Sequence, residues 1–323
     1  MLQEKYTAFK NDVLAQAVTD GYFDGKFTRK QIVLSDDLKS ADILVTYDTG
    51  KRYVFGQTTF KQDFLDDDVF QRFVAYEPGE VYSSTSVANV QRDLYNSNYV
   101  KMIDIDSTPV TADKNVPVVF TLTPKKNKKH MFAIGYGTDT GVRAKYEFDW
   151  RWVNRRGHQL IANAFASQIE QSAGVEYRIP ADKPATDYYK LFANVDRKKD
   201  DDTDSLLWNL GGAYHDQQGN WQREFGIKWQ QEDFTLGDDS GNIGLLTPYA
   251  KMTYRKADDF LNISRGLMLS GELTGAHDAL LSDVSFLQAV ARAKVVRKFG
   301  EVNKVTLSAA VGRTWVDDFH QLP

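Results

Sequence analysis

Between residues 142 and 152 the sequence VRAKYEFDWRW alternates strictly between apolar and charged side chains. The apolar residues of this stretch are Val142, Ala144, Tyr146, Phe148, Trp150 and Trp152. On a helix the intervening charges would be spread around the circumference, whereas on a β-strand they all lie on one face. The pattern predicts a strand with one apolar and one wet face. Such a strand fits either a soluble sandwich or a membrane barrel.

Alternating segments of this kind recur from about residue 130 to the end of the chain, separated by short polar or Gly-bearing turns. We count about eleven of them. Residues 221–234 repeat the alternation of residues 142–152, with Phe225 and Ile227 on the apolar face. Most have about 9 to 14 residues, which is enough for a tilted crossing of a hydrocarbon layer. Strands of soluble proteins average about five or six residues. The lengths therefore favour a membrane barrel.

Aromatic residues and connections favour the same interpretation. Trp150, Trp152 and Trp221 stand near strand ends, where amphipathic rings prefer the headgroup boundary of a membrane. The connections alternate between compact turns such as VNRRGH and acidic ones such as RKKDDDTDS, as expected for a chain that runs up and down. A large soluble sandwich or propeller is the alternative.

The first 125 residues mix helix and strand signals in an order that occurs twice. Residues 5–20 have apolar side chains at helical spacing, and strand-like segments follow at 26–35 and 41–48. Residues 81–100 have a Ser-rich start followed by Val87, Val90 and Leu94 at helical spacing, and two strands follow within 101–124, at an offset of about 75 residues. The pattern predicts an internal repeat. Two unrelated small α+β domains are the alternative.

The second copy of the repeat is the complete one. It adds a leading strand at residues 52–60 and a short helix at 67–75, which gives the order β-α-α-β-β. We therefore expect boundaries at residues 1–50, 51–124 and 130–323. The first of these regions lacks the beginning that the second has.

Composition narrows the class of protein. The chain has 323 residues, 42% of them hydrophobic, and a formal net charge of −4, which gives no electrostatic case for nucleic acid as a partner. It has no cysteine, which excludes disulfides and thiol catalysis. No window approaches the roughly 18 to 20 apolar residues of a spanning helix, so a membrane would have to be crossed by strands.

Candidate catalytic and metal-binding groups are sparse. The five histidines are isolated, without metal-ligand spacing, and we expect most of them at the surface or in turns. Clustered carboxylates at Asp200, Asp201, Asp202 and Asp204 could bind a divalent cation or simply form a solvated loop. The basic run at residues 125–130 could contact lipid phosphates or form a solvated hinge. The sequence predicts no enzyme, no metal and no cofactor.

Four segments carry a family resemblance: GYFDGKFTRKQIVLS, DTGKRYVFGQTTF, GYGTDTGVRAKY and WRWVNRRGHQL. Their order and spacing resemble the TamA family of the BamA/TamA superfamily. The resemblance implies α+β POTRA (polypeptide-transport-associated) domains followed by a sixteen-stranded antiparallel transmembrane barrel. Residues 1–50 would then be the C-terminal part of a POTRA domain, 51–124 the complete last one, and 130–323 the first eleven barrel strands.

The same resemblance implies a longer protein. Earlier POTRA sequence and a signal peptide would precede Met1, while about five strands and a loop with an Arg-Gly-aromatic motif would follow residue 323. We therefore expect this sequence to be a fragment. Its unpaired edge groups would be costly in lipid, so it is not expected to form a stable barrel alone.

The function implied by the resemblance is insertion of proteins into the outer membrane of a Gram-negative bacterium. The expected partners are outer-membrane lipids, unfolded outer-membrane clients of the autotransporter type and a periplasm-spanning TamB-type protein, without nucleic acid. A client strand would pair with the first barrel strand at a weak lateral seam. The alternatives are a BamA-like subunit, a two-partner secretion transporter, or a soluble β-rich binding module.

Specific residues follow from the pattern and the resemblance. The seam strand is expected at Met131, Phe132, Ala133, Ile134, Gly135, Tyr136, Gly137 and Thr138. Lipid-facing side chains are expected at Tyr146, Phe148, Phe225 and Ile227, and interface aromatics at Trp150, Trp152 and Trp221. Gly135 and Gly137 would either weaken packing at the seam or relieve crowding in the wall.

Overall fold

The structure is a computed structural model that describes residues 2–34, 41–200, 202–259, 262–300 and 302–316. The chain divides into two compact units, residues Met1–Lys125 and Lys126–Pro323. Within the described residues, no helix is both long and apolar enough to cross a membrane.

The first unit begins with a helix and a two-stranded antiparallel sheet. Helix α1 spans Leu2–Thr19. Strands β1 (Lys26–Leu34) and β2 (Ala41–Asp48) pair from Lys26 opposite Asp48 to Leu34 opposite Ala41, with a register shift between Phe27 and Arg29. Apolar side chains of these elements, such as Phe9 and Ile32, remain exposed. This part of the unit therefore encloses little core of its own.

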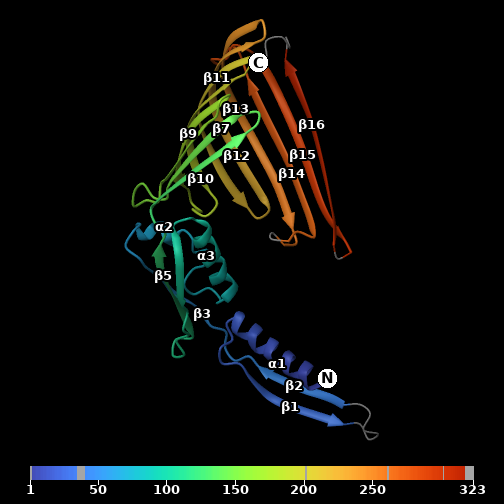
Figure 1. The fold of residues 1–323 in the computed structure, drawn as a ribbon. Helices are drawn as coiled ribbons and strands as arrows, with labels where there is room; N and C mark the ends of the chain where they lie inside the picture. The colour runs from blue at the N-terminus through green and yellow to red at the C-terminus, as the bar shows by residue number, and fades with distance from the viewer. Residues whose placement is uncertain (1, 35–40, 201, 260–261, 301, 317–323) are drawn as a thin grey trace. The chain divides into compact units, whose positions relative to one another are not determined.

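The rest of the first unit, which we call the β3–β5 module, has the element order β-α-α-β-β (Figure 1). Its elements are β3 (Val54–Lys61), α2 (Asp67–Gln71), α3 (Ser84–Asn96), β4 (Val100–Asp106) and β5 (Asn115–Pro124). Strand β5 lies in the centre of the sheet, parallel to β3 and antiparallel to β4. Large side chains close a continuous core, among them Phe70, Val90, Leu94, Val118 and Phe120.

Helix α2 is shorter than the helix predicted at residues 67–75. After Gln71 the backbone N–H groups of Phe73 and Val74 bond to Phe70 and Gln71, three residues back, so the last turn tightens and the α-helix ends.

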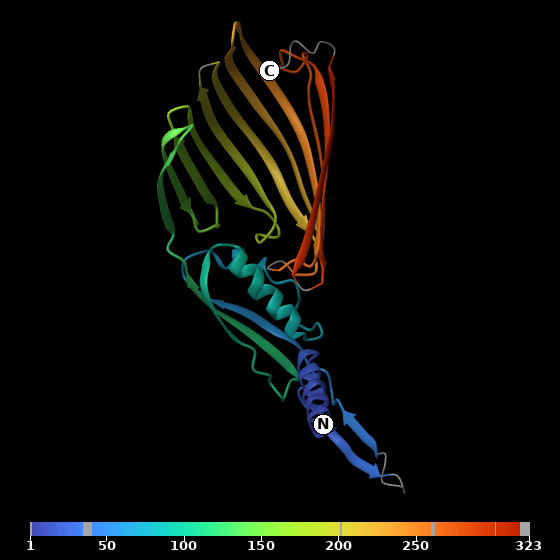
Figure 2. The same cartoon turned by 45° about the vertical axis from the view of Figure 1, so that its right-hand side comes forward.

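The second unit is a single sheet of eleven strands in the described ranges, and it curls as an open wall in Figures 1 and 2. Its strands are β6 (Lys128–Gly137), β7 (Gly141–Trp150), β8 (Gln159–Ala166), β9 (Glu170–Pro180), β10 (Tyr188–Lys199), β11 (Thr203–Gln218), β12 (Trp221–Leu236), β13 (Asp239–Ala257), β14 (Arg265–Ala276), β15 (Phe286–Phe299) and β16 (Asn303–Val316). Each strand is antiparallel to the next along the chain, so β6 and β16 form the two edges.

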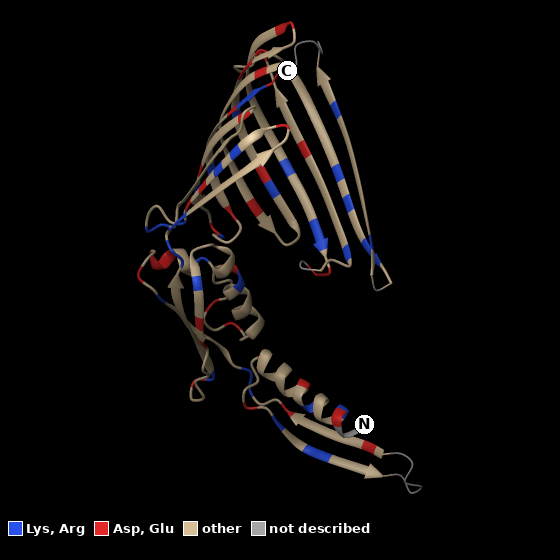
Figure 3. Ribbon diagram, viewed as in Figure 1, with Lys and Arg blue, Asp and Glu red and all other residues tan. Residues whose placement is uncertain are grey.

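The two faces of this sheet differ in chemistry. Cross-strand partners such as Tyr146 and Ala164 place apolar residues on one face, and partners such as Glu147 and Asn163 place polar residues on the other. Side chains from β11 to β16 on the polar face line one common pocket, which requires that face to be concave. Figure 3 shows residues of both charge signs along the strands.

The β14–β15 connection, residues 277–285, closes a free strand edge. The ladder between β13 and β14 begins at Tyr249, and Pro248 has no N–H to extend it. Beyond that point the Gly244 N–H donates to Asp283 Oδ2 (2.6 Å), and the Leu246 N–H donates to Ser282 Oγ (2.9 Å). These two side chains therefore occupy the place of a pairing strand.

Candidate functional site: an edge strand and the two faces of the sheet

Strand β6 is the edge strand that follows the first unit in sequence. It pairs only with β7 among the described residues, from Lys128 opposite Trp150 to Gly137 opposite Gly141. The predicted seam strand ran from Met131 to Thr138. The strand begins three residues earlier, and Thr138 belongs to the turn that returns the chain to Gly141 at φ +67°.

Apolar side chains of β6 stand open on the apolar face. Phe132, Ile134 and Tyr136 are 74%, 85% and 72% exposed. The Phe132 ring contacts Tyr146 of β7 at 4.8 Å, and His130 Nδ1 lies 2.9 Å from the Tyr146 hydroxyl oxygen. The strand is thus held to β7 on one side and offers an apolar surface and unpaired backbone on the other.

The two glycines of β6 have different surroundings. A Cβ added to Gly135 would meet no atom within 4 Å. At Gly137 it would come within 2.5 Å of Thr140 Oγ1 and 3.2 Å of Asp139 Oδ1. A side chain at position 137 would be crowded, so Gly137 fits the role of relieving crowding. Gly135 has open space beside it and fits the role of weakening side-chain packing at the edge.

The residues predicted to face lipid share one face of the sheet. Tyr146 and Phe148 lie opposite Ala164 and Ala162, and Phe225 and Ile227 remain partly exposed on the same face of β12. Lys145 and Glu147, on the other face of β7, form an ion pair. Whether the apolar face meets lipid stays a prediction.

The predicted interface aromatics gather at one end of the sheet. Trp150 ends β7, Trp152 follows it, and Trp221 begins β12, so all three lie at the end where β6 starts. The Lys128 ammonium lies 4.6 Å from the centre of the Trp150 ring, and the Trp221 ring contacts Tyr254 at 5.1 Å. Because the strands run alternately up and down, Trp150 and Trp221, about 70 positions apart in the sequence, lie at the same end of the sheet.

Two of the clustered carboxylates at the β10–β11 connection, Asp200 and Asp204, form ion pairs with lysines. Lys199 lies 3.0 Å from Asp204, and Lys198 lies 3.5 Å from Asp200. In the described parts of the chain no three His, Cys, Asp or Glu residues are grouped so as to hold a metal ion. Asp201, and His320 near the end of the chain, lie outside the described residues.

The sequence did not predict a polar cluster on the concave face around Glu224. Lys190 Nζ lies 2.9 Å from its carboxylate, the Tyr249 hydroxyl donates to it at 3.0 Å, and His215 Nδ1 lies 3.5 Å away. Tyr188 stacks on the His215 ring at 4.9 Å. His215 therefore belongs to this cluster rather than to an exposed turn. Four strands supply these groups, so only their pairing order could have revealed the cluster.

Two solved structures resemble the chain over almost its whole length. BamA from Haemophilus ducreyi, in a form lacking POTRA domains 1–3, superimposes with a TM-score of 0.73 at 11% sequence identity, covering 97% of this chain and 65% of that chain. The chain shares the fold of BamA. CdiB from Escherichia coli gives a TM-score of 0.56 at 12% identity, over 97% of this chain and 62% of that one. No protein-family model matches the sequence.

The likeness to BamA concerns the fold. The antiparallel sheet of eleven strands resembles the BamA barrel, but it is not closed, since β6 and β16 do not pair in the described ranges. This chain spans 65% of the BamA chain and 62% of the CdiB chain. Assignment to the TamA family stays a prediction.

Proposed function

We propose that the protein acts in the outer membrane of a Gram-negative bacterium, in the insertion or secretion of polypeptides, as a member of the superfamily that includes BamA and CdiB. Within that range we favour insertion of autotransporter-type clients by strand templating, in the TamA manner. The observation that carries the proposal is β6, an edge strand with an exposed apolar face and one backbone edge that no described residue pairs with.

The mechanism needs no nucleophile and no cofactor. An unfolded client strand placed beside β6 would form backbone hydrogen bonds before it reaches lipid, where an unpaired peptide group is costly. Gly135 leaves open space beside it, which lowers the side-chain packing that a departing strand must give up.

The first unit supports a periplasmic role. Its β3–β5 module has the order β-α-α-β-β, the order that the resemblance implies for a POTRA domain. We propose that residues 51–124 are the last such domain and 1–50 part of the preceding one. Unfolded clients and a TamB-type protein would be its periplasmic partners.

Outer-membrane lipids would cover the apolar face of the sheet. Trp150, Trp152 and Trp221 would mark the periplasmic boundary of that contact, because indole rings prefer the headgroup level. The concave face would then line a wet lumen, as its Glu224 cluster suits.

Photo-crosslinking tests the proposal. The intact protein is reconstituted in phospholipid vesicles with a photoreactive amino acid in place of Ile134, and a urea-denatured autotransporter barrel is added. The matched control carries the same group at Leu210 of β11, which is also exposed, on a central strand. We expect the nascent client to cross-link at position 134 and not at 210.

The outcomes separate the alternatives. Equal cross-linking at both positions, or none while insertion proceeds, would contradict templating at β6. If the client crosses the vesicle membrane instead of inserting into it, the result would favour secretion, as by a two-partner transporter. Protein that stays monodisperse without detergent would favour the soluble binding module.

A further inference from the structure

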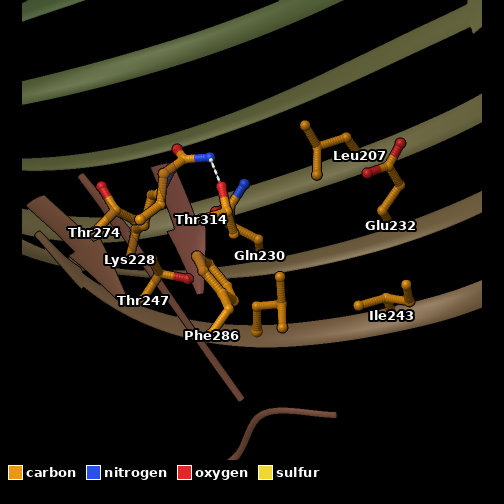
Figure 4. A pocket seen from close by; sticks show the side chains of 11 residues that line it. Leu207, Lys228, Gln230, Glu232, Ile243, Thr247, Thr274, Phe286 and Thr314 are labelled. Carbon is orange, nitrogen blue, oxygen red and sulfur yellow. Dashed lines mark hydrogen bonds between the residues drawn. The ribbon is translucent and has the colours of Figure 1, made fainter. Parts of the chain in front are cut away.

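The concave face of the sheet holds a pocket of about 280 Å³ between β11 and β16. Figure 4 shows Lys228, Thr247 and Thr274 gathered at one end of it, while Leu207 and Glu232 lie at the other. The pocket thus has a hydroxyl-rich basic end and a separate acidic end.

Two polar groups at the basic end have no hydrogen-bond partner among the described residues. Thr247 is 1% exposed, and its Oγ1 makes no hydrogen bond. Lys228 is half-buried, and the described residues supply no hydrogen bond or ion pair to its ammonium group. The two residues are direct cross-strand neighbours on β12 and β13, so their side chains lie side by side. A buried hydroxyl and a cation without partners are costly and point to an anionic ligand.

Two carboxylates lie near Lys228. The charge of Glu272 acts on the Lys228 ammonium group, but the described residues form no ion pair between the two side chains. Glu272 of β14 lies 3.7 Å from Arg292, and Glu232 accepts a hydrogen bond from Ser205 at 2.7 Å. Glu232 stands four residues from Lys228 along β12, about 13 Å away. On the concave face, strands β15 and β16 add only basic charges, at Arg292, Lys294, Lys298 and Lys304. Apart from Glu272, the charges on this part of the concave face therefore favour a negative group at Lys228.

The wall beside the basic end is apolar. Leu245 is buried, and Phe286 and Ile243 pack against it in a cluster closed by Val284 of the 277–285 segment. A ligand that reaches Lys228 would therefore lie with an apolar body on Leu245 and Phe286.

We propose that this pocket binds a small carboxylate with a short apolar body. The carboxylate accepts hydrogen bonds from Lys228 Nζ and Thr247 Oγ1, and the apolar body covers Leu245 and Phe286. One ammonium group matches a singly charged anion. This site is independent of strand templating at β6.

Calorimetric titration of the intact protein in detergent micelles tests the site, with 3-phenylpropionate as the probe. We expect saturable binding that Lys228→Met weakens about tenfold or more, because a charge-assisted hydrogen bond is lost. Thr247→Val weakens it several-fold, and Lys228→Arg retains it. Lys251→Met is the matched control, since Lys251 lies on the same face of β13 outside the pocket and should leave affinity unchanged.

The neutral amide, 3-phenylpropionamide, distinguishes an anion site from a merely apolar one. It should bind at least about tenfold more weakly than the acid. Equal affinity for acid and amide, unchanged affinity in Lys228→Met, or no saturable binding would each overturn the proposal. Thermal unfolding midpoints of Lys228→Met and Lys251→Met show whether a loss of binding reflects a loss of folding.

Discussion

The β3–β5 module buries its large apolar side chains, whereas the eleven-stranded sheet leaves many of its own exposed. In the module, Phe70 and Phe120 are fully buried between helices and strands. In the sheet, Phe132 and Ile134 stand exposed, and the polar residues converge on the concave side. The same preference of apolar groups to leave water gives both arrangements if the sheet meets lipid. The module buries its apolar side chains within itself, whereas the apolar face of the sheet is left for its surroundings to cover.

Truncating a phenylalanine in each unit should give the largest contrast. Phe70→Ala removes a ring that contacts Phe60 and Phe64 at 5.6 and 5.5 Å, and should destabilise the module by about 3–5 kcal/mol. Phe132→Ala should cost about 1 kcal/mol or less, since that ring keeps only its contact with Tyr146. Native-state hydrogen exchange in the intact protein measures both. A similar loss of stability in Phe70→Ala and Phe132→Ala would contradict the expected difference between the two units.

Substitutions on the two faces of β7 should have unequal effects on stability. Phe148→Lys should destabilise the protein in a phospholipid bilayer by about 1–2 kcal/mol, because it places an ammonium group against lipid near the proposed boundary at Trp150, where the cost is lower than at the bilayer midplane. Lys145→Gln, on the opposite face, should cost little. Urea titration of vesicle-embedded protein gives both values. Equal tolerance would contradict a lipid-facing assignment for Phe148.

The side chains of Ser282 and Asp283 cap the free edge of β13, and removing one of them should have an intermediate effect on stability. Asp283→Ala removes the acceptor of the Gly244 N–H and should cost about 1–3 kcal/mol locally. The Gly244 amide should then exchange its hydrogen faster, while amides in the β11–β12 ladder keep their rates. Asp278→Ala is the control, since that carboxylate lies in the same segment without contact to β13. Unchanged exchange at Gly244 would show that the cap contributes nothing.

The smallest effect concerns a surface contact in the first unit. A hydrogen bond from the Lys114 ammonium at 2.8 Å lowers the pKa of Asp24 below its ordinary value. A carboxylate with a lowered folded-state pKa stabilises above its unfolded pKa, and this contribution is lost as the pH falls through the folded value. NMR titration of Asp24 should therefore give a low pKa that Lys114→Met returns toward normal. An equal pKa in both proteins would exclude the pairing in solution.

The sequence predicted those features that repeat locally. Alternation over residues 142–152 was sufficient for β7, and helical spacing was sufficient for α3. The sequence of residues 158–169 is compatible with either face pointing to the apolar side. The pairing of Ala162 with both Phe148 and Val175 places Ala162 on the apolar face. The Glu224 cluster and the pocket around Lys228 join strands distant in the chain, so no local pattern could predict them.

The cap on β13 also bears on self-association. A strand edge with free N–H and C=O groups is a template for pairing with another chain, and natural sheets commonly blunt such edges. Segment 277–285 does so while holding Leu281 at φ +55°, an unfavourable conformation for a leucine. A shorter connection without Leu281 would avoid its positive φ, but without Ser282 and Asp283 it would leave the N–H groups of Gly244 and Leu246 free to pair with another chain. Variants of this loop are therefore expected to tolerate changes in Leu280 and Leu281 better than the loss of Ser282 and Asp283.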